Sequence, residues 1–257
     1  MYTQEISIEI NDSADYDLLI ETFDLLMSSY RTSGQTQGKV ESQFVTNDTI
    51  ICYPYTLEED ALSAKYNNYY VNKWSKEIEK MAKSKLQFKT VGKSHKDYNG
   101  QCKCAQSEYY ILQTNYVSYA SPIVCSTCNW SVPLYKLPIY SDHGYGSILS
   151  WESNYQSCDR LNMNCTVGEK WAMKQMWDVN SQLSKQGIEI CKKITELSQI
   201  PTYYYLFNYR RIRHSQDIKR KCPCCGGEWL LKEKTCHLYD FKCDTCKLIS
   251  SLSSYSF

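Results

Sequence analysis

The sequence predicts an α+β protein with a ferredoxin-like domain, a mixed strand and helix region, and a small cysteine-rich ribbon. Three observations lead to this fold class. Apolar residues in the first hundred positions follow strand and helix periods in turn, apolar stripes at helical spacing fill the middle, and paired cysteine turns lie near the C-terminus. The expected division is 1–92 for the ferredoxin-like α+β domain, 93–106 for a linker, 107–208 for a mixed strand and helix domain with a second Cys-x-x-Cys turn, and 209–257 for a basic segment and a zinc ribbon.

The first hundred residues predict the order β-α-β-β-α-β. Ile6, Ile8 and Ile10 alternate as in a half-buried strand, and Asn47-Asp48 suits a hairpin turn between two strands. The successive segments are a strand at 6–10, a helix at 19–30, a strand ending near 45, a strand at 51–55, a helix at 70–81 and a strand at 86–88. This order is the split βαβ plan of ferredoxin-like domains, which hosts many unrelated functions and selects none.

The middle of the chain predicts one strand followed by helices. Residues 109–119 are rich in tyrosine and β-branched residues and favour a strand. Cys158 and Cys191 each fall on an apolar helical stripe, so we expect both in the core. Gly187 is expected to interrupt the helical region, and a strand resumes at 203–207.

The C-terminal cysteines have the spacing of a four-thiolate zinc ribbon. Cys222 and Cys225 form one Cys-x-x-Cys turn, Cys243 and Cys246 form the other, and two such turns complete a tetrahedron around Zn²⁺. Gly226 and Gly227 suit the positive φ that follows such a turn, and Lys232-Glu-Lys234 is expected to turn the hairpin between them. Cys224 is interpreted as a bystander and His237 as a packing or surface residue. Four thiolates leave no position for water, so this zinc would be structural.

A second Cys-x-x-Cys turn, Cys125 to Cys128, is not followed by a matching turn that would supply the other two ligands. Cys102 and Cys104 could complete a second metal site with it. His143, Cys158 or Cys165 are alternative ligands, and a pair of buried thiols at a tight turn is the interpretation without metal.

Positive charge gathers at the C-terminal end of the chain. The whole sequence has a net charge of +1, yet residues 201–257 carry 10 Lys or Arg against 5 Asp or Glu, whereas residues 1–100 carry 11 against 15. A basic run interleaved with tyrosines can contact phosphates and stack on bases, although such a run is also common as a solvated face. The candidate nucleic-acid-binding residues are Tyr209, Arg210, Arg211, Arg213, Lys219, Arg220 and Lys221.

Composition favours a cytoplasmic protein with no membrane partner. Mean hydropathy is -0.52, and no apolar run approaches the roughly 20 residues of a membrane span. The N-terminus lacks the basic and apolar regions of a secretory signal, so the 14 cysteines are expected to be buried or metal-bound thiols in a reducing compartment.

Several motifs in combination resemble a bacterial family of unknown function. They are Cys125-Ser-Thr-Cys128, Val132-Pro-Leu-Tyr-Lys-Leu-Pro138, Cys158-Asp-Arg-Leu-Asn-Met-Asn-Cys165, Pro201-Thr-Tyr-Tyr-Tyr205 and Phe241-Lys-Cys-Asp-Thr-Cys246. The family is described as Zn-ribbon-containing proteins and candidate nucleic-acid binders. The resemblance covers the chain from about Ser121 onward and implies a shared fold.

The sequence favours a binding protein over an enzyme. It has no Gly-rich phosphate loop, metalloprotease motif or nucleophile elbow. Cys158 or Cys165, beside Asp159 and Arg160, could form a thiol nucleophile, which is the enzymatic alternative. We expect nucleic-acid binding through the basic segment and ribbon. The alternative is a protein-binding module or complex subunit, such as an immunity protein that neutralises a bacterial toxin, with the acidic N-terminal domain facing a basic surface.

Overall fold

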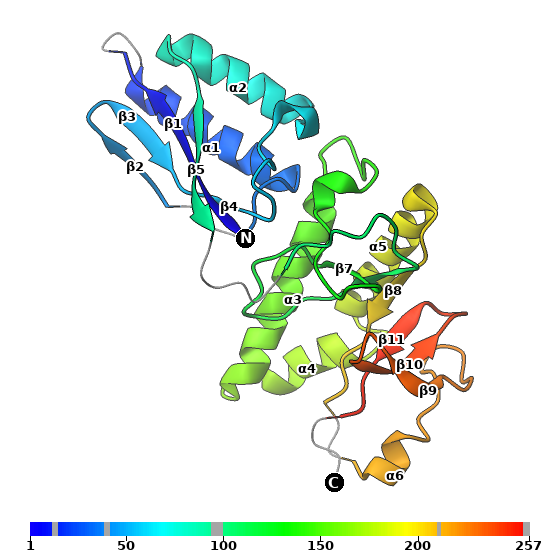
Figure 1. Ribbon diagram of the computed structural model, residues 1–257. Helices are drawn as coiled ribbons and strands as arrows, with labels where there is room; N and C mark the ends of the chain where they lie inside the picture. Colours follow the sequence, from blue (N-terminus) through cyan, green and yellow to red (C-terminus); the bar gives the residue numbers. More distant parts are fainter. Residues whose placement is uncertain (12–14, 39–41, 94–99, 210–211, 254–257) are drawn as a thin grey trace. The chain divides into compact units, whose positions relative to one another are not determined.

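A computed structural model describes residues 1–11, 15–38, 42–93, 100–209 and 212–253 (Figure 1). The chain forms two compact units. The first comprises Met1–Gln101, Tyr119–Ser121 and Pro133–Gly146, and the second comprises Cys102–Ser118, Pro122–Val132 and Ser147–Phe257. Both contain strands and helices, so the predicted α+β class is confirmed. Within the described ranges, no helix combines the length and apolar character needed to cross a bilayer.

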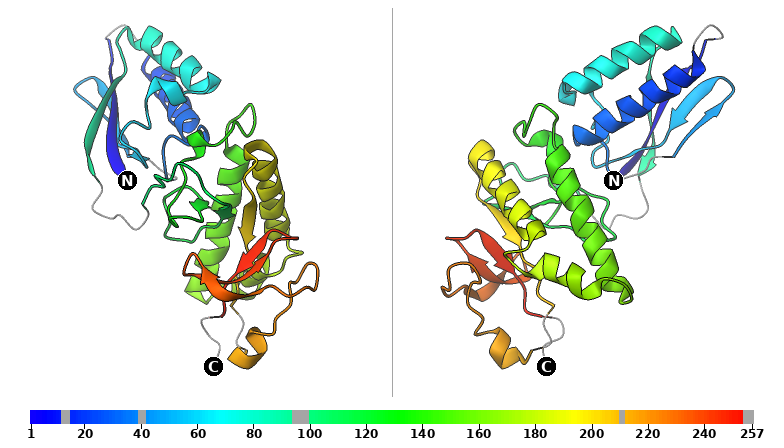
Figure 2. Two further views of the ribbon diagram at one scale, coloured as in Figure 1. Left: turned by 45° about the vertical axis from the view of Figure 1, so that its right-hand side comes forward. Right: turned by 180° about the vertical axis from the view of Figure 1, so that it is seen from behind.

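The first unit is a sheet covered on one face by two helices (Figure 2). Its elements are β1 (Tyr2–Glu9), α1 (Tyr16–Thr32), β2 (Gln43–Thr46), β3 (Thr49–Cys52), β4 (Tyr55–Thr56), a 3₁₀ turn (Ala64–Tyr66), α2 (Tyr69–Ala82), β5 (Gln87–Lys93) and a second 3₁₀ turn (Leu134–Lys136). Strand β1 is central, because β3, β4 and β5 all pair with it in antiparallel fashion, and β2 pairs with β3.

Alternation along β1 sets the core of the first unit. Ile6 and Ile8 are fully buried and face α1, whose side chains Leu19, Phe23 and Leu26 are also buried. The hairpin between β2 and β3 turns at Asn47 and Asp48, both at positive φ (46° and 58°), as the sequence predicts.

The second unit is a six-stranded sheet with helices. Its elements are β6 (Tyr110–Leu112), β7 (Ile123–Cys125), α3 (Gly146–Asn164), α4 (Glu169–Trp177), α5 (Gln182–Ser198), β8 (Thr202–Tyr205), α6 (His214–Asp217), β9 (Leu230–Thr235), β10 (Tyr239–Cys243) and β11 (Leu248–Ser250). The strand order is β7-β6-β8-β11-β10-β9, with β8 parallel to both of its neighbours. The strands that flank the C-terminal cysteines therefore continue the same sheet as the middle of the chain.

Gly187 lies inside helix α5 and does not interrupt it, so that expectation was wrong. A Cβ at this position would meet the ring of Tyr204 at 2.3 Å and Trp151 Nε1 at 2.8 Å. Helix α5 packs this closely on β8 only because residue 187 has no side chain. The glycine serves the packing of helix on sheet at a modest cost in helix propensity.

The expected hairpin turn at Lys232-Glu-Lys234 was also wrong. These residues belong to β9, and the turn falls at Cys236 and His237, with φ of 52° and 58°. Strand β9 is at the edge of the sheet and largely exposed, so it tolerates the charged side chains.

Candidate metal centres

The structure brings together two groups of four cysteines, both in the second unit. The upstream cysteine group is Cys102, Cys104, Cys125 and Cys128, and the C-terminal cysteine group is Cys222, Cys225, Cys243 and Cys246. Within each group, all sulfur atoms lie within 4.8 Å of one another. A tetrahedron with metal–sulfur bonds of about 2.3 Å has sulfurs about 3.8 Å apart. Each group is therefore compact enough to close on one metal ion.

Strands position the upstream cysteine group. Cys125 is the last residue of β7, and the chain turns back so that Asn129 N donates to the Cys125 carbonyl at 2.8 Å. Cys102 joins through its backbone N, which donates to the Ser131 carbonyl at 2.8 Å, just beyond that turn. Of the partners left open by the sequence, the structure thus selects Cys102 and Cys104 for Cys125 and Cys128.

The C-terminal cysteine group joins two turns that are far apart in sequence. Cys243 ends β10, and Cys246 N points back to Cys243 Sγ at 3.4 Å. Cys222 is held by backbone bonds to Gly226 and Gly227. Cys225 Sγ and Cys243 Sγ are 3.7 Å apart, close to the separation that a tetrahedral thiolate site requires.

Each Cys-x-x-Cys turn is followed by a residue in the left-handed region. Asn129, Gly226 and Lys247 have φ of 58°, 70° and 52°. This conformation turns the chain sharply after the second cysteine, which aims both sulfurs at one point. The expectation for Gly226 is confirmed, whereas Gly227 does not have a positive φ. Gly227 instead leaves room for Cys225 Sγ, 3.4 Å from where a Cβ would lie.

Polar neighbours favour the thiolate form at one cysteine of each group. Burial alone would raise the pKa of Cys125, but the Ser107 hydroxyl, 2.7 Å from its sulfur, and the backbone N–H groups of Cys128 and Thr127 lower it to about 6. The backbone N–H of Gly227, together with hydrogen bonds from the other three thiols of the C-terminal cysteine group, lowers the pKa of Cys225 to about 7. These donors suit a metal-binding sulfur, since metal ligation needs the deprotonated thiol.

The other cysteines named from the sequence lie outside the two groups. Cys224 is exposed. Cys158 is buried in α3, and burial followed by the charge of Asp159 raises the pKa of its thiol, the reverse of an activated nucleophile. Cys165 is exposed just after α3, and His143 stacks on Tyr70 in the first unit with ring centroids 5.6 Å apart.

The basic segment is only partly an exposed surface. Arg210 and Arg211 lie outside the described residues. Arg213 and Lys219 flank α6 and are exposed, and Lys221 is exposed but forms an ion pair with Glu228. Tyr209 is half-buried and stacks on Phe207, with ring centroids 5.8 Å apart.

Arg220 differs from the other residues of the expected phosphate-binding set, because its side chain is engaged in the interior. Its side chain is only 12% exposed, and Nε lies 3.2 Å from the buried carboxylate of Asp217. The guanidinium lies over the rings of Trp229 and Phe241, at 4.8 and 4.3 Å, and also donates to Ser250 Oγ. Because these contacts occupy the guanidinium inside the second unit, Arg220 is a structural residue of that unit.

Sequence reasoning missed two residues beside the upstream cysteine group. Ser107 donates its hydroxyl hydrogen bond to Cys125 Sγ, and the Cys236 thiol donates to the Ser126 carbonyl at 3.1 Å. Cys236 has no partner at ligand spacing in sequence, and its contact spans 110 residues. For Ser107, the only signal was its place near Cys102 and Cys104.

Three family descriptions match successive parts of this chain. Residues 1–92 match a family described as "Domain of unknown function (DUF8589)", residues 104–207 match "Domain of unknown function (DUF2310)", and residues 211–256 match "Domain of unknown function (DUF8594)". The expected bacterial family of unknown function is thus supported in this general form, while none of the three descriptions mentions zinc.

Two proteins of Haemophilus influenzae, each described as an uncharacterized protein, are similar to this chain. The first is 34% identical over 238 residues, which cover 89% of this chain and 88% of that protein. The second is 36% identical over 145 residues, which cover 56% of this chain and 71% of that protein. The chain belongs to the same family as these Haemophilus influenzae proteins.

Proposed function

We propose that the second unit holds two structural Zn²⁺ ions, one in each cysteine group. The observation that carries this proposal is the presence of two sets of four sulfur atoms, each within 4.8 Å of one another. Soft thiolates in a tetrahedral set favour zinc, and four protein ligands leave no open position for water or substrate. The chemistry of both sites is therefore to stabilise the fold, and we propose that the protein acts by binding.

Metal content tests this proposal directly. Mass spectrometry of the native protein should find two zinc ions per chain. Cys125→Ser and Cys243→Ser should each lower the content by one ion, and Cys224→Ser is the matched control because it changes an exposed cysteine outside both groups. Full metal content in Cys243→Ser would disprove the C-terminal metal site. A single zinc ion per chain in the unaltered protein would disprove one of the two proposed metal sites.

We infer for the first unit the ferredoxin-like arrangement that its sequence suggests. Support comes from the order β1-α1-β2-β3-α2-β5 along the chain and from β1, which lies between β3 and β5 in an antiparallel sheet. The short β4 is an addition to that plan.

We further propose that the C-terminal segment binds single-stranded nucleic acid. Support comes from the excess of positive charge in residues 201–257 and from the exposed side chains of Arg213 and Lys219. The stacked pair Phe207 and Tyr209 lies on the same segment and offers aromatic faces of the kind that stack on bases. Arg220 is left out, because it is engaged in the interior.

Fluorescence anisotropy with labelled single-stranded oligonucleotides tests nucleic-acid binding. We expect the double variant Arg213→Ala, Lys219→Ala to bind several-fold more weakly, and the slope of log affinity against log salt to fall in magnitude by about 1.4. A control double variant, Lys65→Ala, Lys192→Ala, removes two exposed lysines from other parts of the chain. Absent binding, or equal effects of both double variants, would refute the proposal.

A protein-binding role is the second candidate, and one surface favours it. Met163, Val167 and Trp171 are exposed apolar residues at the junction of α3 and α4. Aromatic and methionine side chains are enriched at protein interfaces. An immunity protein is one form of this role. Protein co-purification that is lost in Trp171→Ala, with no bound nucleic acid, would favour this candidate over nucleic-acid binding.

A further inference from the structure

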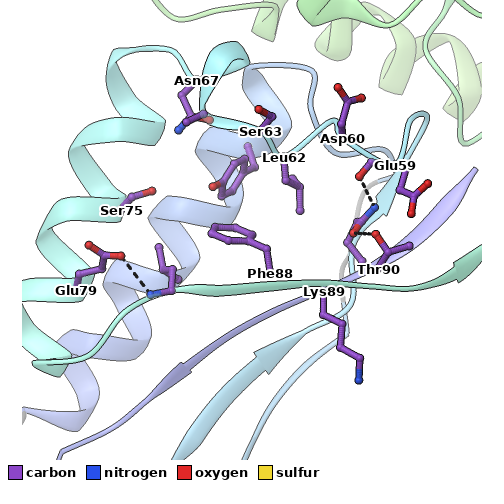
Figure 3. A pocket seen from close by; sticks show the side chains of 14 residues that line it. Glu59, Asp60, Leu62, Ser63, Asn67, Ser75, Glu79, Phe88, Lys89 and Thr90 are labelled. Carbon is purple, nitrogen blue, oxygen red and sulfur yellow. Dashed lines mark hydrogen bonds between the residues drawn. The ribbon is translucent and has the colours of Figure 1, made fainter.

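A cavity of about 500 Å³ lies in the first unit, apart from both cysteine groups. Its walls come from β1, the end of α1, the segment 59–67, α2 and β5 (Figure 3). This volume is typical of pockets for small organic ligands.

One wall of the cavity is formed by the exposed aromatic side chain of Phe88. Phe88 pairs with Ile6 across the sheet, and Ile6 is fully buried, so the register places Phe88 on the side that the helices cover. Phe88 is nevertheless 46% exposed. It meets the buried ring of Tyr30 edge to face, with centroids 6.4 Å apart. A flat apolar ligand could cover Phe88 in the way that a helix covers its neighbours.

Three of the four charged residues that line the cavity are acidic. Glu59, Asp60, Glu79 and Lys89 are the charged residues among the described lining residues. Lys89 extends away from the cavity on the other side of β5 (Figure 3), because it pairs with Glu5 on the opposite face of the sheet from Phe88. Three acidic residues therefore remain at the cavity, and any of them that lacks a basic partner would attract a cation.

These carboxylates differ in how far they are already paired. Asp60 forms an ion pair with Lys65, and Glu79 forms one with Lys85. Among the described residues, the Glu59 carboxylate forms no ion pair. Glu59 is therefore the acidic group with the most unsatisfied charge at this cavity.

The other polar side chains that line the cavity are engaged with one another. Gln4 and Thr90 bond to each other at 3.0 Å, and Gln4 also bonds to Glu59 O. The Ser75 side chain interacts with the Tyr30 hydroxyl. A polar ligand group would therefore meet the Glu59 carboxylate in preference to these side chains.

We propose that this cavity binds a small molecule that carries a flat aromatic ring and a protonated amino group. The ring packs on the exposed face of Phe88, and the ammonium lies toward Glu59. The unpaired charge of Glu59 disfavours a ligand with a phosphate or carboxylate, whereas Asp60 and Glu79 are paired with lysines. This inference goes beyond the metal and nucleic-acid proposals and depends on neither.

Isothermal titration calorimetry of the full chain tests the inference with tryptamine as the probe. Indole-3-propionate is the matched anion, with the same ring and a carboxylate in place of the amine. We expect tryptamine to bind at least tenfold more tightly than the anion. Phe88→Ala and Glu59→Gln should each weaken tryptamine by about tenfold, since each removes one half of the recognition.

Phe44→Ala is the control, because Phe44 is equally exposed, at 44%, on strand β2 and does not line the cavity. Circular dichroism establishes that each variant is folded. Three outcomes would overturn the inference. They are no binding of tryptamine at about 10 mM, equal affinity for tryptamine and for the anion, or an unchanged affinity for tryptamine in Phe88→Ala and Glu59→Gln.

Discussion

The thiol of Cys236 donates a hydrogen bond to the backbone carbonyl of Ser126, with sulfur and oxygen 3.1 Å apart. Cys236 lies in the turn between β9 and β10, and Ser126 directly follows Cys125 of the upstream cysteine group. The hairpin that leads into the C-terminal cysteine group therefore contacts the turn of the upstream cysteine group. Tyr109 strengthens this contact, since its hydroxyl lies 3.7 Å from Cys236 Sγ.

Removal of the Cys236 thiol should weaken this connection. We expect Cys236→Ala to lower the free energy of unfolding by about 1 kcal/mol, the usual net value of one hydrogen bond with its packing. Cys236→Ser keeps a donor and should lose less. Urea unfolding of both variants measures the difference, and equal stability of Cys236→Ala and the unaltered protein would contradict the role of this contact.

Ser107→Ala should weaken metal binding at the upstream cysteine group alone. The Ser107 hydroxyl bonds to Cys125 Sγ, and loss of such a supporting group typically lowers metal affinity by about tenfold or more. Chelator competition followed by zinc release should show one site that empties earlier and one that is unchanged. A variant that loses both ions in parallel with the unaltered protein would argue against this role for Ser107.

Arg220→Ala should destabilise the second unit strongly. Its removal leaves the carboxylate of Asp217, which is fully buried, without its ion-pair partner, and such a loss costs about 3–5 kcal/mol. Arg220→Lys keeps the charge but not the planar guanidinium over Trp229, so it should recover only part of the stability. Arg213→Ala is the exposed control. Thermal unfolding followed by tryptophan fluorescence ranks the three variants, and similar stability of Arg220→Ala and Arg213→Ala would count against a structural Arg220.

Gly187→Ala should disturb the packing of α5 on β8. The added methyl group would clash with the Tyr204 ring and with Trp151 Nε1, and overpacking of this kind costs about 1–3 kcal/mol. Gly146→Ala is a matched control, because nothing lies within 4 Å of a Cβ at that position. Chemical denaturation of both variants tests the difference. Helix propensity alone would make both substitutions stabilising.

These residues show which features of the structure could be predicted from the sequence and which could not. Local spacing was sufficient for the cysteine turns and for the hairpin turn at Asn47-Asp48, because both depend on neighbours in sequence. The interior position of Arg220 and the close packing at Gly187 depend on contacts between distant segments. Sequence reasoning interpreted each by its intrinsic preference, charge for Arg220 and helix breaking for Gly187, and tertiary packing outweighed that preference in both cases.

The cavity beside Phe88 had no signal in the sequence either. Phe88 has the residue type and the strand position of a core residue, and only the actual cover of the sheet by α2 decides whether it is buried. The open position follows from how far a helix reaches across a sheet, which hydrophobic periodicity does not encode.

Tyr30 should make the first unit less stable at high pH. Burial raises the pKa of its hydroxyl from 10.0 to about 12, and the side chain is only 1% exposed. The unfolded chain ionises this tyrosine near pH 10, whereas the folded protein holds it neutral. Its contribution to stability is therefore complete below pH 10 and is lost as the pH rises toward 12.

A comparison with Tyr30→Phe isolates this contribution from those of other groups that titrate in the same range. Between pH 9 and pH 11, the free energy of unfolding of the unaltered protein should fall by about 1 kcal/mol more than that of the variant. Urea unfolding at the two pH values, followed by circular dichroism, gives the four free energies. Parallel losses in both proteins would mean that Tyr30 ionises at an ordinary pH in the folded state, which would contradict the burial of its hydroxyl.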